Sequence, residues 1–462
     1  MEEEIEKGCH EYSEDDEAKA FEEEEMIFSL LNVHENNNSI HQVDHLDSKN
    51  IIREDEIFVA SLQMKLRKKK ALLEFRCMVE DAILGNYILE NPKVNLSKKE
   101  MNKMIEQLGE ITLWGVPLLP SKGHEGTDTV LLKFLKAKDF KVQEAFNMLR
   151  KTLKWRKDYK TDAILEEDLL LDLDLDKVLY VNSVDKQGNP LYYNMYGAFK
   201  DKEFYKRVLG TEEDREKFLR WRIQFMEKII KKLTFKAGEA GSVLQITDFK
   251  NSPGPEMKEL RAVSKKAFFL LQANYPEIIH ANILINVPFW YYTSLLVSSK
   301  LVNHRTKRNF IFVRPSKVTQ TLLKYITPEN LPIEYGGLKR DNDGEFLPED
   351  SASEVIVKGN SSRSIKIPVS EAGVTIVWEF TVVGWDVTCR EEFIPEDEGS
   401  YKILLRKSKE RKMGECVRNS FYINEPGKIM ITIDNATLKK RRVYYRSKIK
   451  PFVPNYIINN IK

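Results

Sequence analysis

The sequence predicts a multidomain protein with an α/β lobe at its centre, a helical module before the lobe and an all-β sandwich after it. Three observations lead to this prediction. Short apolar strands alternate with helical stretches from residue 243 to residue 313, period-two hydrophobic patterning follows residue 352, and the first 56 residues carry 19 acidic and 4 basic side chains. Alternating strands and helices are typical of a parallel sheet, and period-two patterning is typical of antiparallel strands.

The acidic leader, residues 1–56, is expected to be disordered. It combines glutamate runs with an asparagine run and few aromatic residues, which leaves too little apolar area to offset the entropy cost of ordering. The leader is either a solubilising tail or an intramolecular mask for the rest of the chain. That remainder carries 69 basic and 52 acidic side chains, a balance that favours an anionic partner such as nucleic acid or an acidic membrane surface.

Composition also indicates the cellular compartment. No window of 18 uncharged apolar residues occurs, and the acidic N-terminus does not resemble a signal peptide. The four cysteines lack disulfide-type or metal-type spacing, as expected in a reducing compartment; they are Cys9, Cys77, Cys389 and Cys416. We therefore expect a cytoplasmic protein that associates peripherally with membranes.

Two helical regions precede the lobe. Residues 57–104 form a basic helical segment in which five cations between Lys65 and Lys70 lie beside leucines. Such a helix either lies on an anionic membrane or presents a solvated face. Residues 105–165 are predicted to be a small helical module, because apolar residues recur at helical spacing over residues 130–138 and 142–159.

The lobe is assigned to residues 166–338. Its buried strands are Val243–Phe249, Ile283–Val287 and Phe310–Val313, with helices expected at Glu256–Asn274 and Phe289–Asn303. A hairpin over residues 174–196 and a helix over residues 212–233 precede them. The loops after the strands contain neither a glycine-rich phosphate cradle nor a nucleophile elbow. The sequence therefore gives no support for an enzyme.

A polar stretch rich in turn formers, residues 339–352, marks a domain boundary. After it, Val374, Ile376, Trp378 and Phe380 alternate with other residues, as do the isoleucines from Ile429 to Ile433. About eight short strands separated by turn residues predict a β-sandwich over residues 353–450. Residues 451–462 form a tail.

Several long motifs resemble known families. The run TDTVLLKFLKAKDF is similar to the helical N-terminal module of CRAL-TRIO lipid-transfer proteins, and ITDFKNSPGPEM, NYPEIIHANILINVPFWYY and ENLPIEYGG are similar to their lipid-binding lobe. The run GVTIVWEFTVVGWDVTCREEF resembles a GOLD domain. An acidic leader, a CRAL-TRIO lobe and a C-terminal GOLD domain, in this order, is the layout of the patellins.

This resemblance implies a closed apolar cavity for a lipid, with a gating helix that begins at Phe289, Trp290, Tyr291 and Tyr292. The headgroup residues that it implies are Lys138, Glu277, Thr306 and Asn309. The family pattern has a lysine where this chain has Asn309, so that only Lys307 or Arg308 could supply the missing charge. Recognition of phosphatidylinositol is therefore less firmly implied than lipid binding itself.

The C-terminal strand region offers a second anion site. No acidic residue follows Asp434, whereas cations are frequent there. We expect these cations to form an anionic-membrane patch, which comprises Lys439, Lys440, Arg441, Arg442, Arg446 and Lys448. Nucleic acid could use the same charges with Tyr444 and Tyr445 for stacking, but a nucleic-acid partner is not expected.

The leading hypothesis is a non-enzymatic protein that binds and transfers phospholipids, including phosphoinositides, at cytosolic membrane surfaces. The patellin resemblance further implies membrane trafficking linked to cell-plate formation and cell division. The alternative is an adaptor whose GOLD domain recruits a trafficking protein while the lobe senses lipid. No cofactor is expected other than a bound phospholipid, whose identity the sequence leaves open.

Overall fold

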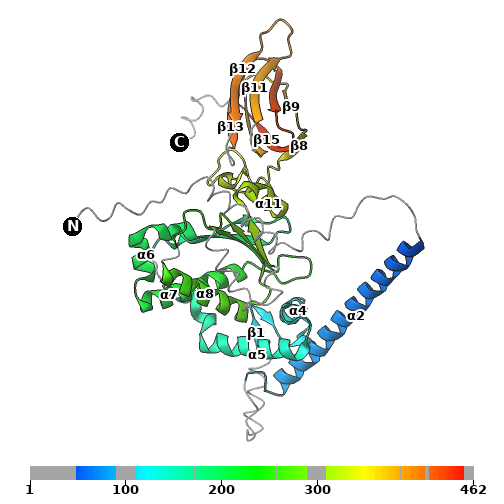
Figure 1. The fold of residues 1–462 in the computed structure, drawn as a ribbon, viewed down its shortest axis with the longest axis vertical. Helices are drawn as coiled ribbons and strands as arrows, with labels where there is room; N and C mark the ends of the chain where they lie inside the picture. Colours follow the sequence, from blue (N-terminus) through cyan, green and yellow to red (C-terminus); the bar gives the residue numbers. More distant parts are fainter. Residues whose placement is uncertain are drawn as a thin grey trace, which may run out of the picture.

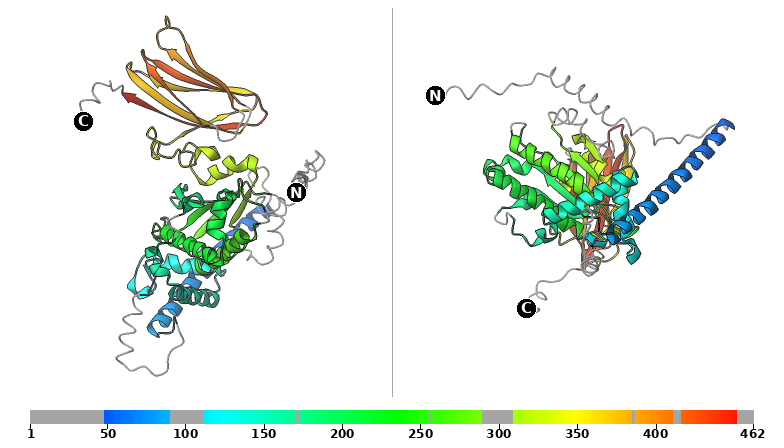
Figure 2. Two further views of the ribbon diagram at one scale, coloured as in Figure 1. Left: turned by 90° about the vertical axis from the view of Figure 1, so that its left-hand side faces the viewer. Right: turned by 90° about the horizontal axis from the view of Figure 1, so that it is seen from below.

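The computed structural model describes residues 48–89, 111–169, 173–254, 257–288, 309–384, 387–410 and 416–451. A helical module, an α/β lobe and a β-sandwich follow one another along the long axis of the molecule (Figure 1). The long helix α2 (Ser48–Leu84) leaves the helical module and projects away from the body (Figure 2). Residues 1–47 of the leader, residues 289–308 and the tail from residue 452 lie outside the described residues.

Besides α2, the described part of the helical module contains β1 (Thr112–Leu113), β2 (Val116–Pro117), the short helix η2 (Pro120–Lys122), α4 (Thr127–Ala137) and α5 (Val142–Asp158). The C-terminal half of α2 packs against α4 and α5 and buries Phe75, Val79 and Ala82. Helix α2 begins at Ser48, nine residues before the predicted helical segment, so it includes residues 48–56 of the predicted leader. Acidic composition argued against a buried core there, but it is compatible with a helix because glutamate has a high helix propensity.

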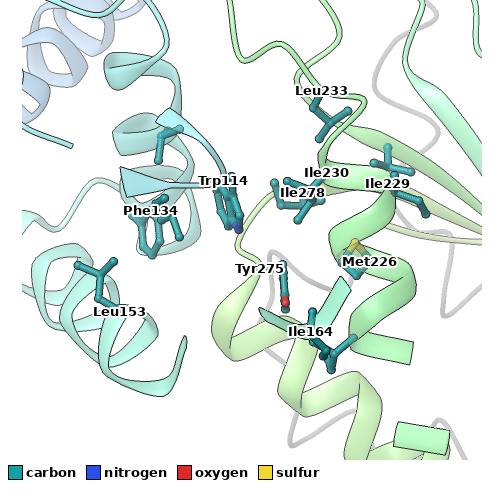
Figure 3. Packing of buried hydrophobic residues seen from close by; sticks show 14 of the residues in the cluster. Trp114, Phe134, Leu153, Ile164, Met226, Ile229, Ile230, Leu233, Tyr275 and Ile278 are labelled. Carbon is teal, nitrogen blue, oxygen red and sulfur yellow. The ribbon is translucent and has the colours of Figure 1, made fainter. Parts of the chain in front are cut away.

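An aromatic cluster joins the helical module to the lobe (Figure 3). Trp114, in the turn between β1 and β2, stacks near Phe134 of α4 at 6.1 Å, Phe235 at 5.6 Å and Tyr275 at 6.4 Å between ring centroids. All four side chains are buried. Aromatic pairs at these separations stabilise a core beyond the area that they bury. The module and the lobe therefore share one hydrophobic core.

The lobe contains a five-stranded sheet in the order β3-β4-β5-β6-β7. Its strands are β3 (Leu179–Val184), β4 (Pro190–Met195), β5 (Val243–Asp248), β6 (Ile279–Ile285) and β7 (Phe310–Val313). Strands β4 to β7 are parallel, which confirms the predicted parallel sheet, and β3 pairs with β4 as an antiparallel hairpin. The predicted hairpin thus becomes one edge of the same sheet.

Helices cover both faces of this sheet. Helices α6 (Lys202–Leu209), α7 (Glu212–Ile230) and α8 (Lys258–Asn274) lie on one face, and α11 (Val318–Tyr325) lies on the other (Figure 1). Adjacent side chains of a strand point to opposite faces. Tyr192 accordingly packs with the residues of α7, whereas Tyr193 packs with those of α11.

Eight strands form the predicted β-sandwich. They are β8 (Ser353–Val357), β9 (Ser361–Val369), β10 (Val374–Val383), β11 (Val387–Pro395), β12 (Ile403–Glu410), β13 (Val417–Ile423), β14 (Gly427–Asn435) and β15 (Arg441–Pro451). One sheet has the order β13-β10-β15-β8 and the other β12-β11-β14-β9. Their inner faces bury Trp378, Phe380 and Ile431, the alternating residues that predicted the sandwich.

The polar stretch 339–352 lies against the outer face of the first sandwich sheet. Just before it, the Gly336 carbonyl accepts a hydrogen bond from Thr381 Oγ1 (3.1 Å), and Leu338 packs in the same cluster as Tyr444 of β15. We refer to this contact between residues 336–350 and strands β10, β13 and β15 as the seam. The predicted boundary is therefore a packed interface between lobe and sandwich.

A charge cluster lies within the seam. The carboxylate of Glu379 is fully buried and accepts hydrogen bonds from Arg446 Nε at 2.7 Å and from Arg418 Nε at 2.8 Å. Arg418 also donates to Asp343 at 2.7 Å. The ring of Phe346 lies against both guanidinium groups, 4.6 Å from Arg446 and 5.2 Å from Arg418. Opposite charges from the linker and the sandwich are thus paired in the seam, where Arg340 Nε also lies 3.5 Å from Glu379.

Arg446 was predicted to belong to the anionic-membrane patch, and that prediction is wrong. Its side chain is 4% exposed, and besides Glu379 it donates to the backbone carbonyls of Leu347 and Asp350 at 3.1 and 2.9 Å. Arg446 pairs across the sheet with Glu379, so that both side chains lie on the outer face of this sheet. The linker covers that face. Alternation along a strand does not predict whether another segment covers its outer face.

Candidate functional site

A row of hydrogen-bonded polar side chains crosses the sheet face that α7 and α8 cover. The Tyr192 hydroxyl donates to Gln245 Oε1 (2.6 Å), Gln245 Nε2 donates to Thr247 Oγ1 (2.9 Å), and Thr247 Oγ1 donates to Asn282 Oδ1 (2.9 Å). Three of the four residues are buried, and Asn282 is half-buried. Polar groups are costly to bury unless they are hydrogen-bonded. We define this set as the polar row.

Aromatic side chains surround the polar row. Phe225 of α7 meets the Tyr192 ring edge to face at 5.5 Å, and Phe268 of α8 meets Phe310 of β7 at 5.8 Å. Phe268, Phe310 and Phe312 are only half-buried among the described residues. An apolar surround with a few oriented polar groups is the usual character of a small-molecule site in a protein.

A cation lies beside the polar row. Arg222 of α7 is 8% exposed, and its guanidinium lies 6.0 Å from the centre of the Phe218 ring. Burial raises the pKa of Tyr192, and the positive charge of Arg222 opposes that rise. The two side chains are therefore close enough to interact electrostatically. Neither residue was singled out from the sequence.

A signal for Arg222 was nevertheless present in the sequence. It lies four residues after Phe218 and four before Met226, and both of these are buried. Positions four apart share one face of a helix. The apolar stripe of α7 therefore includes an arginine, and a cation in an apolar stripe indicates a special environment.

The headgroup residues implied by the resemblance occupy a different place. Glu277 lies just before β6 with a positive φ of 55°, and Asn309 lies just before β7, where its carbonyl accepts the Asn282 N–H at 2.7 Å. Both therefore lie at the same edge of the parallel sheet. Lys138 is half-buried at the C-terminal end of α4. Thr306 and Arg308 lie outside the described residues, as do the gate residues Phe289, Trp290, Tyr291 and Tyr292.

Lys133 is a second buried cation that was not singled out from the sequence. Its Nζ donates to the Glu277 carbonyl (2.8 Å) and to Ser242 Oγ (3.2 Å), and its side chain is buried. Burial, reinforced by the nearby charge of Lys136, lowers the pKa of Lys133 to about 8. Lys133 thus ties α4 to the strand edge that carries Glu277.

The remaining residues of the predicted anionic-membrane patch differ in their environments. Lys439 and Lys440 are exposed in the turn before β15, and Arg441 is half-buried. Arg442 lies 3.6 Å from Glu354, and Lys448 lies 3.6 Å from Asp350. Neighbouring carboxylates therefore already engage Arg442 and Lys448, whereas Lys439 and Lys440 face solvent.

The projecting part of α2 carries a second group of exposed cations. Every side chain from residue 62 to residue 70 is exposed, including Leu62 and Leu66. The cations of this stretch are Lys65, Arg67, Lys68, Lys69 and Lys70. Leucines and lysines on one exposed helix are typical of a surface that contacts an anionic membrane.

Comparison with known proteins agrees with this architecture. The profile of the CRAL/TRIO N-terminal domain matches residues 98–151, that of the CRAL/TRIO domain residues 176–337, and that of the Patellin-1-like C-terminal GOLD domain residues 358–441. Patellin-6 of Arabidopsis thaliana is 39% identical over 85% of this chain and 89% of its own length. The chain belongs to the patellin family.

This patellin family member is also similar to a second patellin and to a phosphatidylinositol transfer protein. Patellin-4 of Arabidopsis thaliana is 49% identical over 74% of the chain, which spans 62% of that relative's length. The phosphatidylinositol transfer protein sfh5 of Sclerotinia sclerotiorum is 31% identical over 55% of the chain and 63% of its own length.

The residues that the structure describes contain neither a membrane-spanning helix nor a group of metal-binding side chains. Among these residues, no helix has the length and apolar character needed to cross a membrane. In the same part of the chain, no group of three or more histidine, cysteine, aspartate or glutamate side chains is placed to hold a metal ion.

Proposed function

We propose that the chain binds one phospholipid in the lobe and transfers it between membranes without catalysis. The polar row carries this proposal, because it sets oriented hydrogen-bonding groups within an aromatic interior on the face between the sheet and helices α7 and α8. The relatives support it, since one of them is named a phosphatidylinositol transfer protein.

The energetics of transfer explain why a lobe of this kind is needed. Moving two acyl chains of about 30 methylenes through water costs over ~20 kcal/mol at ~0.8 kcal/mol each. A carrier must therefore enclose the chains and open only at a membrane. In this proposal the segment that begins at Phe289, which lies outside the described residues, is the gate, and Trp290 and Tyr291 contact the bilayer interface, where amphipathic aromatic residues are favoured.

The proposal extends to where the chain acts. The exposed cations of α2, together with Lys439 and Lys440, attract the protein to anionic cytosolic membrane surfaces, including those that contain phosphoinositides. The proposal includes a role in membrane trafficking linked to cell-plate formation and cell division, which is what the resemblance to the patellins implies.

Lipid uptake from vesicles tests the proposal. The purified chain is incubated with mixed phospholipid vesicles, separated from them, and weighed by native mass spectrometry. We expect a mass increase of one phospholipid per chain, and a fluorescent-lipid assay should show transfer to acceptor vesicles. Chain that gains no lipid from any vesicle would contradict the proposal and would favour the adaptor hypothesis.

A further inference from the structure

Arg222 is a buried cation whose position is set by the apolar stripe of its helix. It lies on α7 between the buried residues Phe218 and Met226, and it is 8% exposed. It lies three residues before Phe225, whose ring meets that of Tyr192, the first member of the polar row, at 5.5 Å. The guanidinium is therefore held between helix and sheet, where solvent contributes little to its stabilisation.

Other buried arginines of the chain have carboxylate partners. Arg156 lies 2.7 Å from Glu227, and Arg446 lies 2.7 Å from Glu379. Within the described ranges Arg222 forms no ion pair, and its buried Nε has no hydrogen-bond acceptor. An arginine cannot escape burial by losing its proton. An unpaired buried charge is destabilising by several kcal/mol, so that a partner of opposite charge is strongly favoured there.

A second unsatisfied polar group lies on the neighbouring helix. Ser264 Oγ of α8 is buried and has no hydrogen-bond partner among the described residues. Ser264 precedes Phe268 by one helical turn, and Phe268 contacts Phe310 on the sheet face that carries the polar row. Residues four apart share one helix face. Ser264 therefore points into the same layer between helices and sheet as Arg222.

We infer that Arg222 binds the phosphate group of the phospholipid carried in the lobe, an inference that rests on the proposed function. A phosphate accepts bidentate hydrogen bonds from a guanidinium and supplies the missing negative charge. It also offers acceptors to a hydroxyl such as that of Ser264. This position differs from the edge of the sheet where Glu277 and Asn309 lie. The phosphate is thus read above the middle of the sheet, next to the polar row.

Two arginine-to-methionine variants on one helix test the inference. Arg222→Met removes the unpaired cation. Arg220→Met is the matched control, because Arg220 pairs with Glu167 and donates to the Tyr159 carbonyl at 3.0 Å. Each protein is loaded from vesicles that contain phosphatidylcholine and diacylglycerol with the same acyl chains, and bound lipid is counted by mass spectrometry. Thermal unfolding of each lipid-free protein is recorded in parallel.

The expected results separate the two arginines. Arg222→Met should lower phosphatidylcholine loading about tenfold or more, because a charge-assisted hydrogen bond is lost. Diacylglycerol lacks the phosphate, so its loading should not change. The lipid-free Tm of Arg222→Met should equal or exceed that of wild type. Arg220→Met should lower the Tm and leave lipid selectivity unchanged.

Three results would count against the inference. Equal phosphatidylcholine loading by wild type and Arg222→Met contradicts it while leaving the proposed function intact. A lower lipid-free Tm for Arg222→Met, with diacylglycerol loading reduced equally, assigns Arg222 a structural role. Inorganic phosphate is the third probe: if it stabilises wild type but not Arg222→Met and no phospholipid is loaded, the site binds free phosphate and the lipid source is wrong.

Discussion

Two regions of the molecule bury an arginine in different surroundings. At the seam, Arg446 contacts the carboxylate of Glu379 and the carbonyls of Leu347 and Asp350, so that its donors are met by protein groups. Between α7 and the sheet, Arg222 is nearly as buried, but within the described residues it has no carboxylate to neutralise it. The first charge is part of an interface between domains, and the second is beside the polar row.

The difference teaches how to separate structural from functional buried charge. A buried ion pair fixes geometry, and removing one partner leaves the other charge at high cost. A buried charge without a protein partner stabilises nothing in the empty protein and becomes favourable only when a ligand supplies the opposite charge. Burial alone does not distinguish a structural charge from a functional one, whereas the presence or absence of an oppositely charged protein group does.

The largest effect is expected from breaking the seam. Glu379→Gln leaves Arg446 and Arg418 without their shared carboxylate, and we expect a loss of about 3–5 kcal/mol in the free energy of unfolding. Urea unfolding followed by tryptophan fluorescence measures it, since Trp378 is in the sandwich core. Glu354→Gln, which removes an exposed pair with Arg442, is the control and should cost under about 1 kcal/mol. Equal losses for the two variants would show that the buried charge cluster of the seam contributes no more to stability than an exposed ion pair.

The next largest effect is expected on the pH dependence of stability, and it comes from Lys133. Its folded pKa of about 8 lies below the usual 10.5. Between these values the unfolded chain binds a proton that the folded chain does not, so stability rises with pH. From pH 8 to 10.5 wild type should gain on the order of 3 kcal/mol relative to Lys133→Met. Urea unfolding at several pH values measures this difference. A constant difference across that range would mean that Lys133 is not desolvated in solution.

Substitution of exposed cations should have a smaller effect, which is a loss of binding to anionic vesicles. Replacing Lys439 and Lys440 together by glutamine should weaken binding to anionic vesicles about tenfold at low salt. Lys448→Gln should change it less, because Asp350 already lies near that lysine. Vesicle sedimentation across a salt series measures both. If Lys448→Gln has the larger effect, the pairing seen at the seam does not persist at a membrane.

The smallest effect is expected from the acidic leader. Its carboxylates are tethered to the same chain as the exposed lysines, at an effective concentration that reaches about the millimolar range. Deleting residues 1–47 should therefore strengthen binding to acidic vesicles severalfold at low ionic strength, and salt should abolish the gain. Binding that is the same with and without the leader at every salt concentration would leave it as a solubilising tail.

The fold followed from periodicity to a large extent. Phe310–Val313 is the strand predicted, and the helix predicted at 142–159 ends one residue earlier, at Asp158. Such elements are predictable because hydrophobic spacing reflects which side of a strand or helix is buried locally.

The site was less predictable, for a different reason. Periodicity places Arg446 on the outer face of its strand and Arg222 on the inner face of its helix, but it does not report what lies opposite. At Arg446 the opposing group is a linker about 100 residues earlier in the chain, and at Arg222 it is the polar row. Long-range partners decide whether a cation is paired, solvated or left for a ligand.

Helix α2 gives the molecule a physical reach. Its 37 residues make a rod of about 55 Å at 1.5 Å per residue. Lys68 already contacts the globular body, since its Nζ lies 5.4 Å from the centre of the Phe140 ring, so roughly 30 Å of the rod precedes this contact. A flat bilayer that approaches from this side meets the rod before it meets the lobe. For the proposed transfer at a membrane, the angle between rod and bilayer would set the clearance across which a lipid passes.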